Sequence, residues 1–151
     1  IKPDREEQGL FTDTYFTAVQ KIIVQEGNTE IKGIDDLKDK TIGVQSGTTG
    51  DFAAEEVTKD VVRFNNGLEA AIDLKNGRLD AVIIDNLPAQ MIVNQNPGLV
   101  VLEGKAAEDE EYAMAVRKEA KDLQEIINQV LGELKADGQI KEWVEEYSLL
   151  D

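Results

Sequence analysis

The sequence predicts an α/β fold with a mainly parallel sheet covered by helices on both faces. Short apolar runs typical of strands alternate with segments of helical periodicity between residues 15 and 102. The run Asp80–Ile84 is almost fully apolar, which is typical of a strand buried on both faces. A chain of 151 residues is long enough for one core, or for a compact domain with an appended element.

The elements of this predicted sheet follow one another with clear stop signals. Asn76–Gly77 is a typical end of a helix, and Pro88 suits the first turn of the next helix. The opening through Thr14 is polar and rich in turn residues. We expect strands at 15–25, 40–45, 61–64, 80–84 and 99–102, a short helical turn at 34–37, and helices at 51–57, at 68–75 and from about Pro88 to Asn96.

The last third of the chain predicts a strand and two amphipathic helices. Glu103–Glu111 is charged and linker-like, and 112–116 is expected to form a strand. Asp137–Gly138 separates the two helices, and Trp143 in the second is expected to be a core residue. Both helices need an apolar partner surface. Their apolar faces comprise Leu123, Ile126, Ile127, Val130, Leu131 and Leu134, then Ile140, Trp143, Val144 and Tyr147.

The composition excludes several classes of protein. A formal charge of −15 argues against a nucleic-acid partner, because phosphate binding draws on clustered Lys and Arg. With no cysteine there is neither a disulfide nor a thiolate zinc site, and with no histidine the commonest general base is missing. No apolar run approaches the ~18 residues of a membrane span. Ile1–Arg5 does not read as a signal peptide, so a secretion signal is expected outside this chain.

The loop Ser46–Gly50 is the strongest candidate for an anion site. Parallel sheets bind ligands outside the carboxyl ends of their strands, and this loop follows one such end at Gln45. Backbone N–H groups at a helix start, flanked by the hydroxyls of Thr48 and Thr49, suit a carboxylate. The alternative is a glycine-rich turn in which Thr49 caps the following helix.

Two charged residues could complete a site for a zwitterion. Asp85 directly follows the apolar strand 80–84 and suits an ammonium group; it could instead cap the next helix. Arg5 could clamp a carboxylate bidentately, or be an ordinary solvated surface charge among acidic neighbours.

Sites for other chemistry are not supported by the sequence. It lacks the G-x-S-x-G, G-x-x-x-x-G-K-[ST] and G-x-G-x-x-G patterns. Glu108–Glu111 lacks the ligand pattern of an EF-hand and fits a solvated linker better than a calcium site. We therefore expect no catalytic residue, no metal ligand and no cofactor.

Several motifs, in order along the whole chain, resemble the polar amino-acid binding proteins of ABC transporters (solute-binding family 3). Ile1–Glu7 resembles the family's T-x-x-R segment and Phe11–Phe16 its F-S-D-x-Y-F stretch. Ile34–Gly50 matches L-x-D-L-K-G-K-x-V-G-V-x-x-G-T-T, and Leu74–Asp85 matches L-x-x-G-x-x-D-A-V-x-x-D. Leu134–Gly138 resembles the L-K-x-D-G turn that precedes the closing helix.

The resemblance implies roles for the candidate residues. Arg5, Thr49 and the backbone at Thr48 would hold the carboxylate of an amino acid, and Asp85 would hold its ammonium group. Gln45 lies where the family varies with the ligand side chain, so it would help to select the ligand. The implied function is capture of a polar or charged L-amino acid outside the cytoplasm, in the periplasm or tethered to the cell surface, and delivery to the membrane subunits of an ABC importer.

The implied architecture is the type II periplasmic-binding-protein fold, in which two α/β lobes close on the ligand by a hinge. Residues 18–105 would be a complete second lobe, whereas 1–17 and 106–151 would be parts of the first lobe, whose initial portion is not in this chain. The apolar helices would then lack their sheet, so a homo-oligomer or a domain-swapped assembly is expected. This chain alone would bind ligand weakly or not at all.

Three other functions remain open at this point. A cyclohexadienyl dehydratase-like enzyme is similar in fold and would need a general acid from Glu, Asp or Lys. A sensory ligand-binding domain would normally continue into membrane or kinase segments. A fragment that binds nothing by itself is the third alternative.

Overall fold

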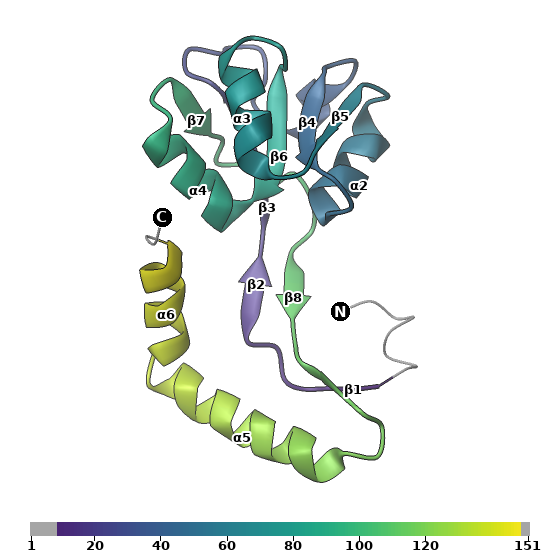
Figure 1. Ribbon diagram of the computed structural model, residues 1–151, viewed down its shortest axis with the longest axis vertical. Coiled ribbons are helices and arrows are strands. Elements are labelled where there is room, and N and C mark those ends of the chain that lie inside the picture. The colour runs from purple at the N-terminus through teal and green to yellow at the C-terminus, as the bar shows by residue number, and fades with distance from the viewer. Residues whose placement is uncertain (1–8, 149–151) are drawn as a thin grey trace. The chain divides into compact units, whose positions relative to one another are not determined.

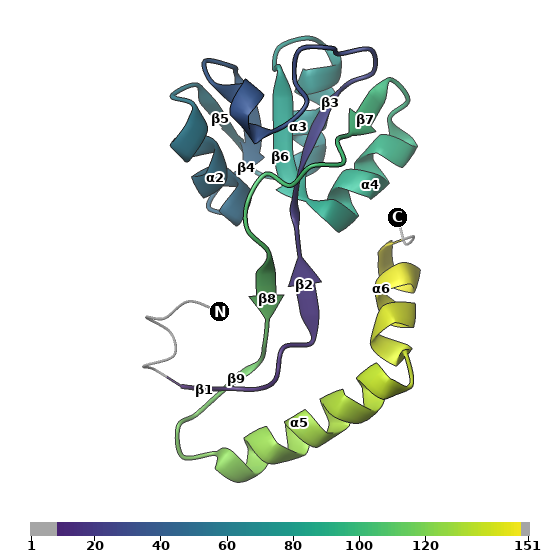
Figure 2. The ribbon, with the colours of Figure 1, turned by 180° about the vertical axis from the view of Figure 1, so that it is seen from behind.

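The structure, a computed structural model, describes residues 9–148. Its contacts divide the chain into two compact units: Val19–Glu108, and a second unit formed by the segments on either side of it, up to Ala18 and from Asp109. Figures 1 and 2 show the elements of each unit from two opposite sides. None of the described helices is long and apolar enough to cross a membrane.

The unit Val19–Glu108 contains a five-stranded mixed sheet. Its strand order is β5-β4-β6-β3-β7 (Figure 1). β4 runs parallel to both of its neighbours, whereas β3 is antiparallel to both of its neighbours. The expectation of a mainly parallel sheet therefore overlooked β3, which enters the sheet between two strands that both run against it. The strands are β3 (Gln20–Gln25), β4 (Ile42–Gln45), β5 (Val61–Phe64), β6 (Ala81–Asp85) and β7 (Leu99–Val101).

Apolar cores cover both faces of this sheet, as the sequence predicts. Alternate residues of β3 and β6 point to opposite faces, so that Ile22 and Ile83 belong to one core and Ile23 and Val82 to the other. The first core includes Leu37 and residues of α2, and the second includes residues of α3 and α4. The helical elements are η1 (Ile34–Leu37), α2 (Thr49–Val57), α3 (Gly67–Lys75) and α4 (Asn86–Gln95).

Two of the predicted strands are each divided in the structure. The expected strand 15–25 is β2 (Phe16–Ala18) followed by β3, and Val19 between them belongs to neither strand. The expected strand 112–116 is β8 (Glu110–Tyr112) and then β9 (Ala115–Val116). The charge of Glu110 and Glu111 predicts a linker, but in the structure both residues pair with β2 in an exposed two-stranded ribbon, where charged side chains remain in water.

The other unit combines short β-ribbons with two helices. β1 (Leu10–Phe11) pairs with β9, and β2 pairs with β8. The amide of Asp13 donates to Asn128 Oδ1 at 2.8 Å, and the side chains of Gln124 and Lys135 donate to carbonyl oxygens of the N-terminal segment. These bonds connect the described N-terminal segment to α5 (Lys121–Ala136), which is followed by α6 (Gln139–Ser148).

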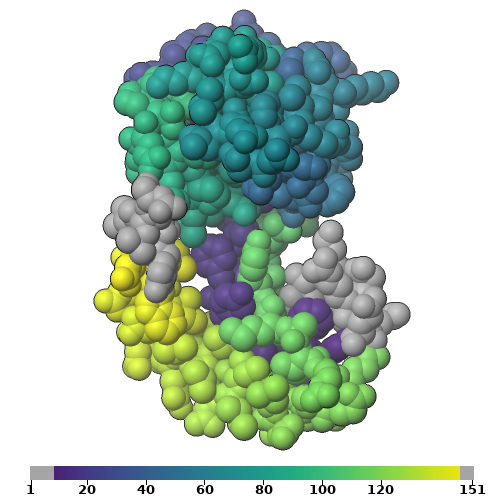
Figure 3. All heavy atoms as spheres, viewed as in Figure 1, coloured from purple at the N-terminus to yellow at the C-terminus, as the bar shows by residue number. Residues whose placement is uncertain are grey.

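The amphipathic helices are present where the sequence predicts them, but much of their apolar face is exposed. Leu131 is buried, whereas Ile126 is 60% exposed and Trp143 is 42% exposed. The expectation that Trp143 is a core residue is therefore wrong in this structure. Side chains of α5 and α6 lie at the surface in Figure 3, in yellow-green and yellow. That a second copy of the chain covers this face stays a prediction.

Candidate ligand-binding site

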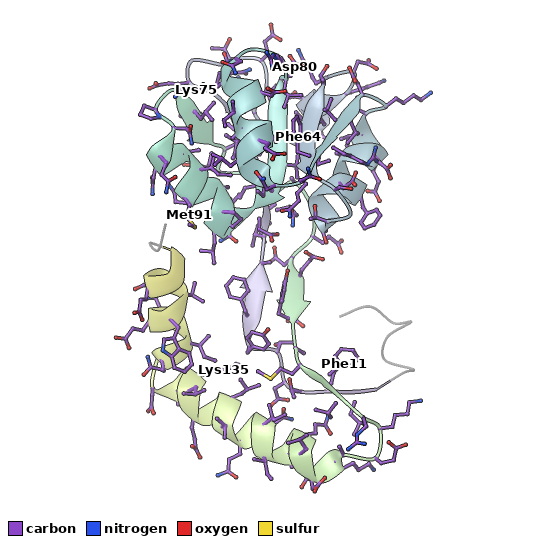
Figure 4. The ribbon with its side chains drawn as sticks, viewed as in Figure 1. Phe11, Phe64, Lys75, Asp80, Met91 and Lys135 are labelled. Carbon is purple, nitrogen blue, oxygen red and sulfur yellow. The ribbon has the colours of Figure 1, made fainter. Side chains whose placement is uncertain are left out.

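The carboxyl ends of the parallel strands β4, β5 and β6 lie along one edge of the five-stranded sheet. Edge here means the side at which strands end, not an outer strand. Gln45 at the end of β4 pairs with Phe64 at the end of β5, and Val44 pairs with Ile83 of β6. Asp85, two residues after Ile83, therefore lies at the same edge as the loop that follows Gln45. Asp80, which precedes β6, lies at the opposite edge (Figure 4). This edge is where a parallel arrangement of strands places a ligand.

The loop Ser46–Thr48 turns sharply from β4 into α2. Gly47 has a φ of 73°, a left-handed conformation that disfavours any residue with a Cβ. The amide of Ser46 donates to the carbonyl of Phe64 at 3.0 Å, which holds the loop against the end of β5. The first amides of α2 consequently start at the edge of the sheet, and amides of a first turn have no carbonyl partner within their helix.

Thr48, and not Thr49, caps α2. The hydroxyl of Thr48 accepts from the amide of Asp51 at 3.4 Å and donates to the carbonyl of Gln45 at 2.8 Å. The alternative in which Thr49 is the cap is wrong, because Thr49 already belongs to the helix. Since the hydroxyl hydrogen of Thr48 is used on Gln45, any anion at this helix start would be held by backbone N–H groups and by Thr49 rather than by the Thr48 hydroxyl.

A buried carboxylate, which the sequence did not reveal, supports the loop from behind. Asp51 is 5% exposed, and its Oδ2 accepts from the amide of Gly47 at 2.9 Å. Arg63 of β5 binds both oxygens of Asp51, from Nε to Oδ2 at 3.0 Å and from Nη2 to Oδ1 at 2.9 Å. The hydrogen bond from Arg63 to Asp51 raises the pKa of the guanidinium. The negative charge of Asp51 is thus compensated by a cation that stays ionised.

Asp85 is held by a glutamine that was not among the predicted site residues. Gln20 lies directly opposite Asp85 in the antiparallel pair of β3 and β6, and its Nε2 donates to Asp85 Oδ1. Asp85 stands at the N-cap position of α4, yet its side chain makes no capping hydrogen bond there. The alternative in which Asp85 serves as a side-chain cap therefore receives no support from the structure.

Gly50 brings the first turn of α2 close to Gln20 and β6. A Cβ at Gly50 would lie 2.9 Å from Gln20 Oε1 and 3.0 Å from the carbonyl oxygen of Ile83. Both distances are too short for ordinary contact with a methyl group. Gly50 and Gln20 thereby connect the helix start to Asp85, and the two halves of the predicted site lie in one neighbourhood.

Arg5 lies outside the described residues. Gln45 ends β4 with its side chain partly buried. Among residues 9–148 there is no group of three or more Asp or Glu side chains that could hold a metal ion. The arrangement therefore offers hydrogen-bond donors for an anion beside a carboxylate for a cation.

Comparison with known proteins connects this geometry to one family. The family model described as bacterial extracellular solute-binding proteins, family 3, matches residues 1–149. The ABC transporter glutamine-binding protein GlnH of Bacillus subtilis (strain 168) is 32% identical over 97% of this chain and 55% of its own length.

Two solved structures show the same similarity in three dimensions. A P235GK mutant of ArgBP from T. maritima has a TM-score of 0.78 and 40% identity, over 97% of this chain and 64% of that chain. The amino acid ABC transporter substrate-binding protein AbpA from Streptococcus pneumoniae, bound to L-arginine, has a TM-score of 0.83 and 27% identity, over 98% and 64%. The chain thus spans less than two thirds of the length of each of these relatives.

Proposed function

Because this chain belongs to the bacterial extracellular solute-binding proteins, family 3, we propose that it binds the charged groups of a free amino acid at the edge of its five-stranded sheet. The family resemblance and the predicted α/β fold of the type II periplasmic-binding-protein class are both confirmed by the comparisons. One observation carries the proposal: Gln20 lies between Asp85 and the start of α2. Its Nε2 donates to Asp85 Oδ1, and its Oε1 would lie only 2.9 Å from a Cβ at Gly50.

The carboxylate of the amino acid would bind at the first turn of α2. Amide donors and the positive end of the helix dipole both favour an anion there. The buried Asp51 would otherwise repel a carboxylate, but Arg63 binds both of its oxygens. Thr49 and the amide of Gly50 are the donors we assign to the ligand.

The ammonium group would bind Asp85. A carboxylate has about four lone-pair sites, so Asp85 can accept from an ammonium group while it also accepts from Gln20. Gln45, at the end of the adjacent strand β4, would contact the ligand side chain and help to select it. The glutamine-binding relative and the relative whose structure contains L-arginine suggest L-glutamine and L-arginine as the first ligands to test.

The wider role is proposed from the same relatives. Residues 18–105 would form a complete second lobe, and 1–17 with 106–151 would contribute to the first lobe of a longer receptor. That receptor would collect its amino acid outside the cytoplasmic membrane and present it to the membrane subunits of an ABC importer. Binding without chemical conversion is the activity that this donor and acceptor set supports best.

Isothermal titration calorimetry with L-arginine and L-glutamine tests the proposal. We expect the chain to bind at least one of them, but weakly, because it spans only part of the length of its relatives. Asp85→Asn should weaken that binding about 30-fold or more, because removing one charge of a close pair typically costs about 2 kcal/mol or more.

Asp80→Asn is the matched control. Asp80 flanks the same strand at its other end and also accepts a hydrogen bond, from the amide of Thr41 at 2.8 Å. The Asp80→Asn substitution should leave the affinity for the amino acid unchanged. Equal affinities of wild type and Asp85→Asn, or equal losses in Asp85→Asn and Asp80→Asn, would contradict the proposed site.

A further inference from the structure

Gln20 is a polar residue in a position where an apolar one would be expected. The three residues after Lys21 on β3, Ile22, Ile23 and Val24, are fully buried and belong to the two cores. Gln20 itself is only 3% exposed, and its Oε1 has no hydrogen-bond partner among the described residues. A buried amide oxygen without a partner costs free energy, so the position calls for a physical reason.

The nitrogen and the oxygen of the Gln20 carboxamide each lie next to one part of the proposed site, Asp85 or the start of α2. Nε2 donates to Asp85 Oδ1, and Oε1 faces Gly50 in the first turn of α2. The missing Cβ at Gly50 provides the space that this oxygen occupies. Gln20 therefore stands between the group that would bind an ammonium ion and the helix start that would bind a carboxylate.

A neutral donor suits this position better than any charged side chain. A lysine or arginine opposite Asp85 would neutralise the carboxylate and repel an ammonium group, whereas a glutamate would compete with Asp85 for the cation. A glutamine amide fixes one oxygen of Asp85 and leaves its full negative charge in place.

We propose that Gln20 is a positioning residue for ligand binding: it orients Asp85 toward the ammonium group of the amino acid and does not itself touch the ligand. This inference rests on the proposed function and adds a residue that acts through another. It also accounts for the position of Gly50, because a methyl group there would displace the carboxamide that holds Asp85.

A double-mutant cycle in amino-acid affinity tests this proposal. Gln20→Met removes the donor but keeps an unbranched side chain of similar length. Loss of one hydrogen bond to a charged group corresponds to about a tenfold loss of affinity. In an Asp85→Asn background the same change should cost nothing further, because Gln20 acts through the Asp85 carboxylate.

Gln25→Met is the matched control. Gln25 ends the same strand, and its Nε2 donates to the carbonyl of Leu74 at 2.6 Å, away from Asp85. Its replacement should leave the affinity unchanged. If Gln20→Met fails to fold, Gln20→Glu keeps the shape of the side chain. It should weaken binding at neutral pH and recover part of the affinity on acidification, when a protonated glutamate can donate to Asp85.

The outcomes separate this inference from the function on which it rests. If wild type binds L-arginine or L-glutamine and Gln20→Met binds equally well, the inference fails alone. It fails in the same way if Gln20→Met costs the same factor with and without the Asp85 carboxylate. If wild type binds neither amino acid, the proposed function fails, and the inference fails with it.

Discussion

Replacing Gly50 by alanine tests how closely α2 approaches β6. The new methyl group would lie 2.9 Å from Gln20 Oε1, 3.0 Å from the carbonyl oxygen of Ile83 and 3.2 Å from Ile83 Cγ2. The backbone oxygen of Ile83 belongs to a central strand and cannot move aside like the end of a flexible side chain. The first turn of α2 must therefore shift.

Two effects of opposite sign set the size of the change. Alanine is favoured over glycine in a helix by at most about 1 kcal/mol. Overpacking at a rigid contact costs typically about 1–3 kcal/mol. We expect Gly50→Ala to range from neutral to a loss of about 2 kcal/mol in the free energy of unfolding.

Gly132→Ala provides the matched control. Gly132 lies within α5, and a Cβ there would meet no atom within 4 Å. This change should stabilise its unit by about 1 kcal/mol. The two substitutions should therefore differ by about 1–3 kcal/mol, which is the cost of the close approach alone.

The two units require separate probes of urea unfolding. Trp143 is the single tryptophan of the chain and lies in α6, so its fluorescence reports the unit that contains Gly132. Amide resonances of β4 and β6 report the unit that contains Gly50. If Gly50→Ala stabilised its unit as much as Gly132→Ala does, α2 would not pack as closely as described.

Three further predictions concern the cap, the core and a surface ion pair. Thr48→Ala should lower the free energy of unfolding in urea by about 1 kcal/mol, because the helix cap is lost. Thr48→Ser should retain most of that stability, and equal losses in the two variants would contradict the capping role. Leu74→Ala, at a fully buried position, should cost about 2–5 kcal/mol in the same assay, and a loss below about 1 kcal/mol would refute tight packing there. The hydrogen bond from Lys40 lowers the pKa of Glu30, so this pair stabilises the fold at neutral pH and loses its effect as pH falls through that lowered pKa. The small difference in thermal midpoint between wild type and Glu30→Gln should therefore vanish on acidification, and a constant difference would contradict it.

Strong local patterns predicted most of the five-stranded unit. The helical turn Ile34–Leu37 and the strand Val61–Phe64 were predicted with the boundaries they have in the structure. Their apolar residues carry the period of their element, and turn residues bound them. The antiparallel placement of β3 was not predictable in this way, because strand direction depends on contacts distant in sequence.

Within the candidate site, the sequence favoured residues with an obvious chemical role. Asp85 and the loop Ser46–Gly50 stand out by charge and by glycine and hydroxyl content. Gln20 and Arg63 have no such signal, since each lies inside a strand and acts through a partner far along the chain. A charged residue among apolar neighbours in β5 is the pattern that could have marked Arg63. Gln20 begins a strand that also contains Lys21 and Gln25, so no such pattern marks it.

A titration of the ¹⁵N-labelled chain with L-arginine, followed by amide resonances, tests the central claim most directly. We predict shifts concentrated at Thr49, Gly50 and the amides next to Asp85. Agmatine, which is arginine without its carboxylate, should leave Thr49 and Gly50 unshifted. Saturating shifts confined to other parts of the chain, or equal shifts with agmatine at Thr49 and Gly50, would contradict the claim that α2 and Asp85 together bind an amino acid.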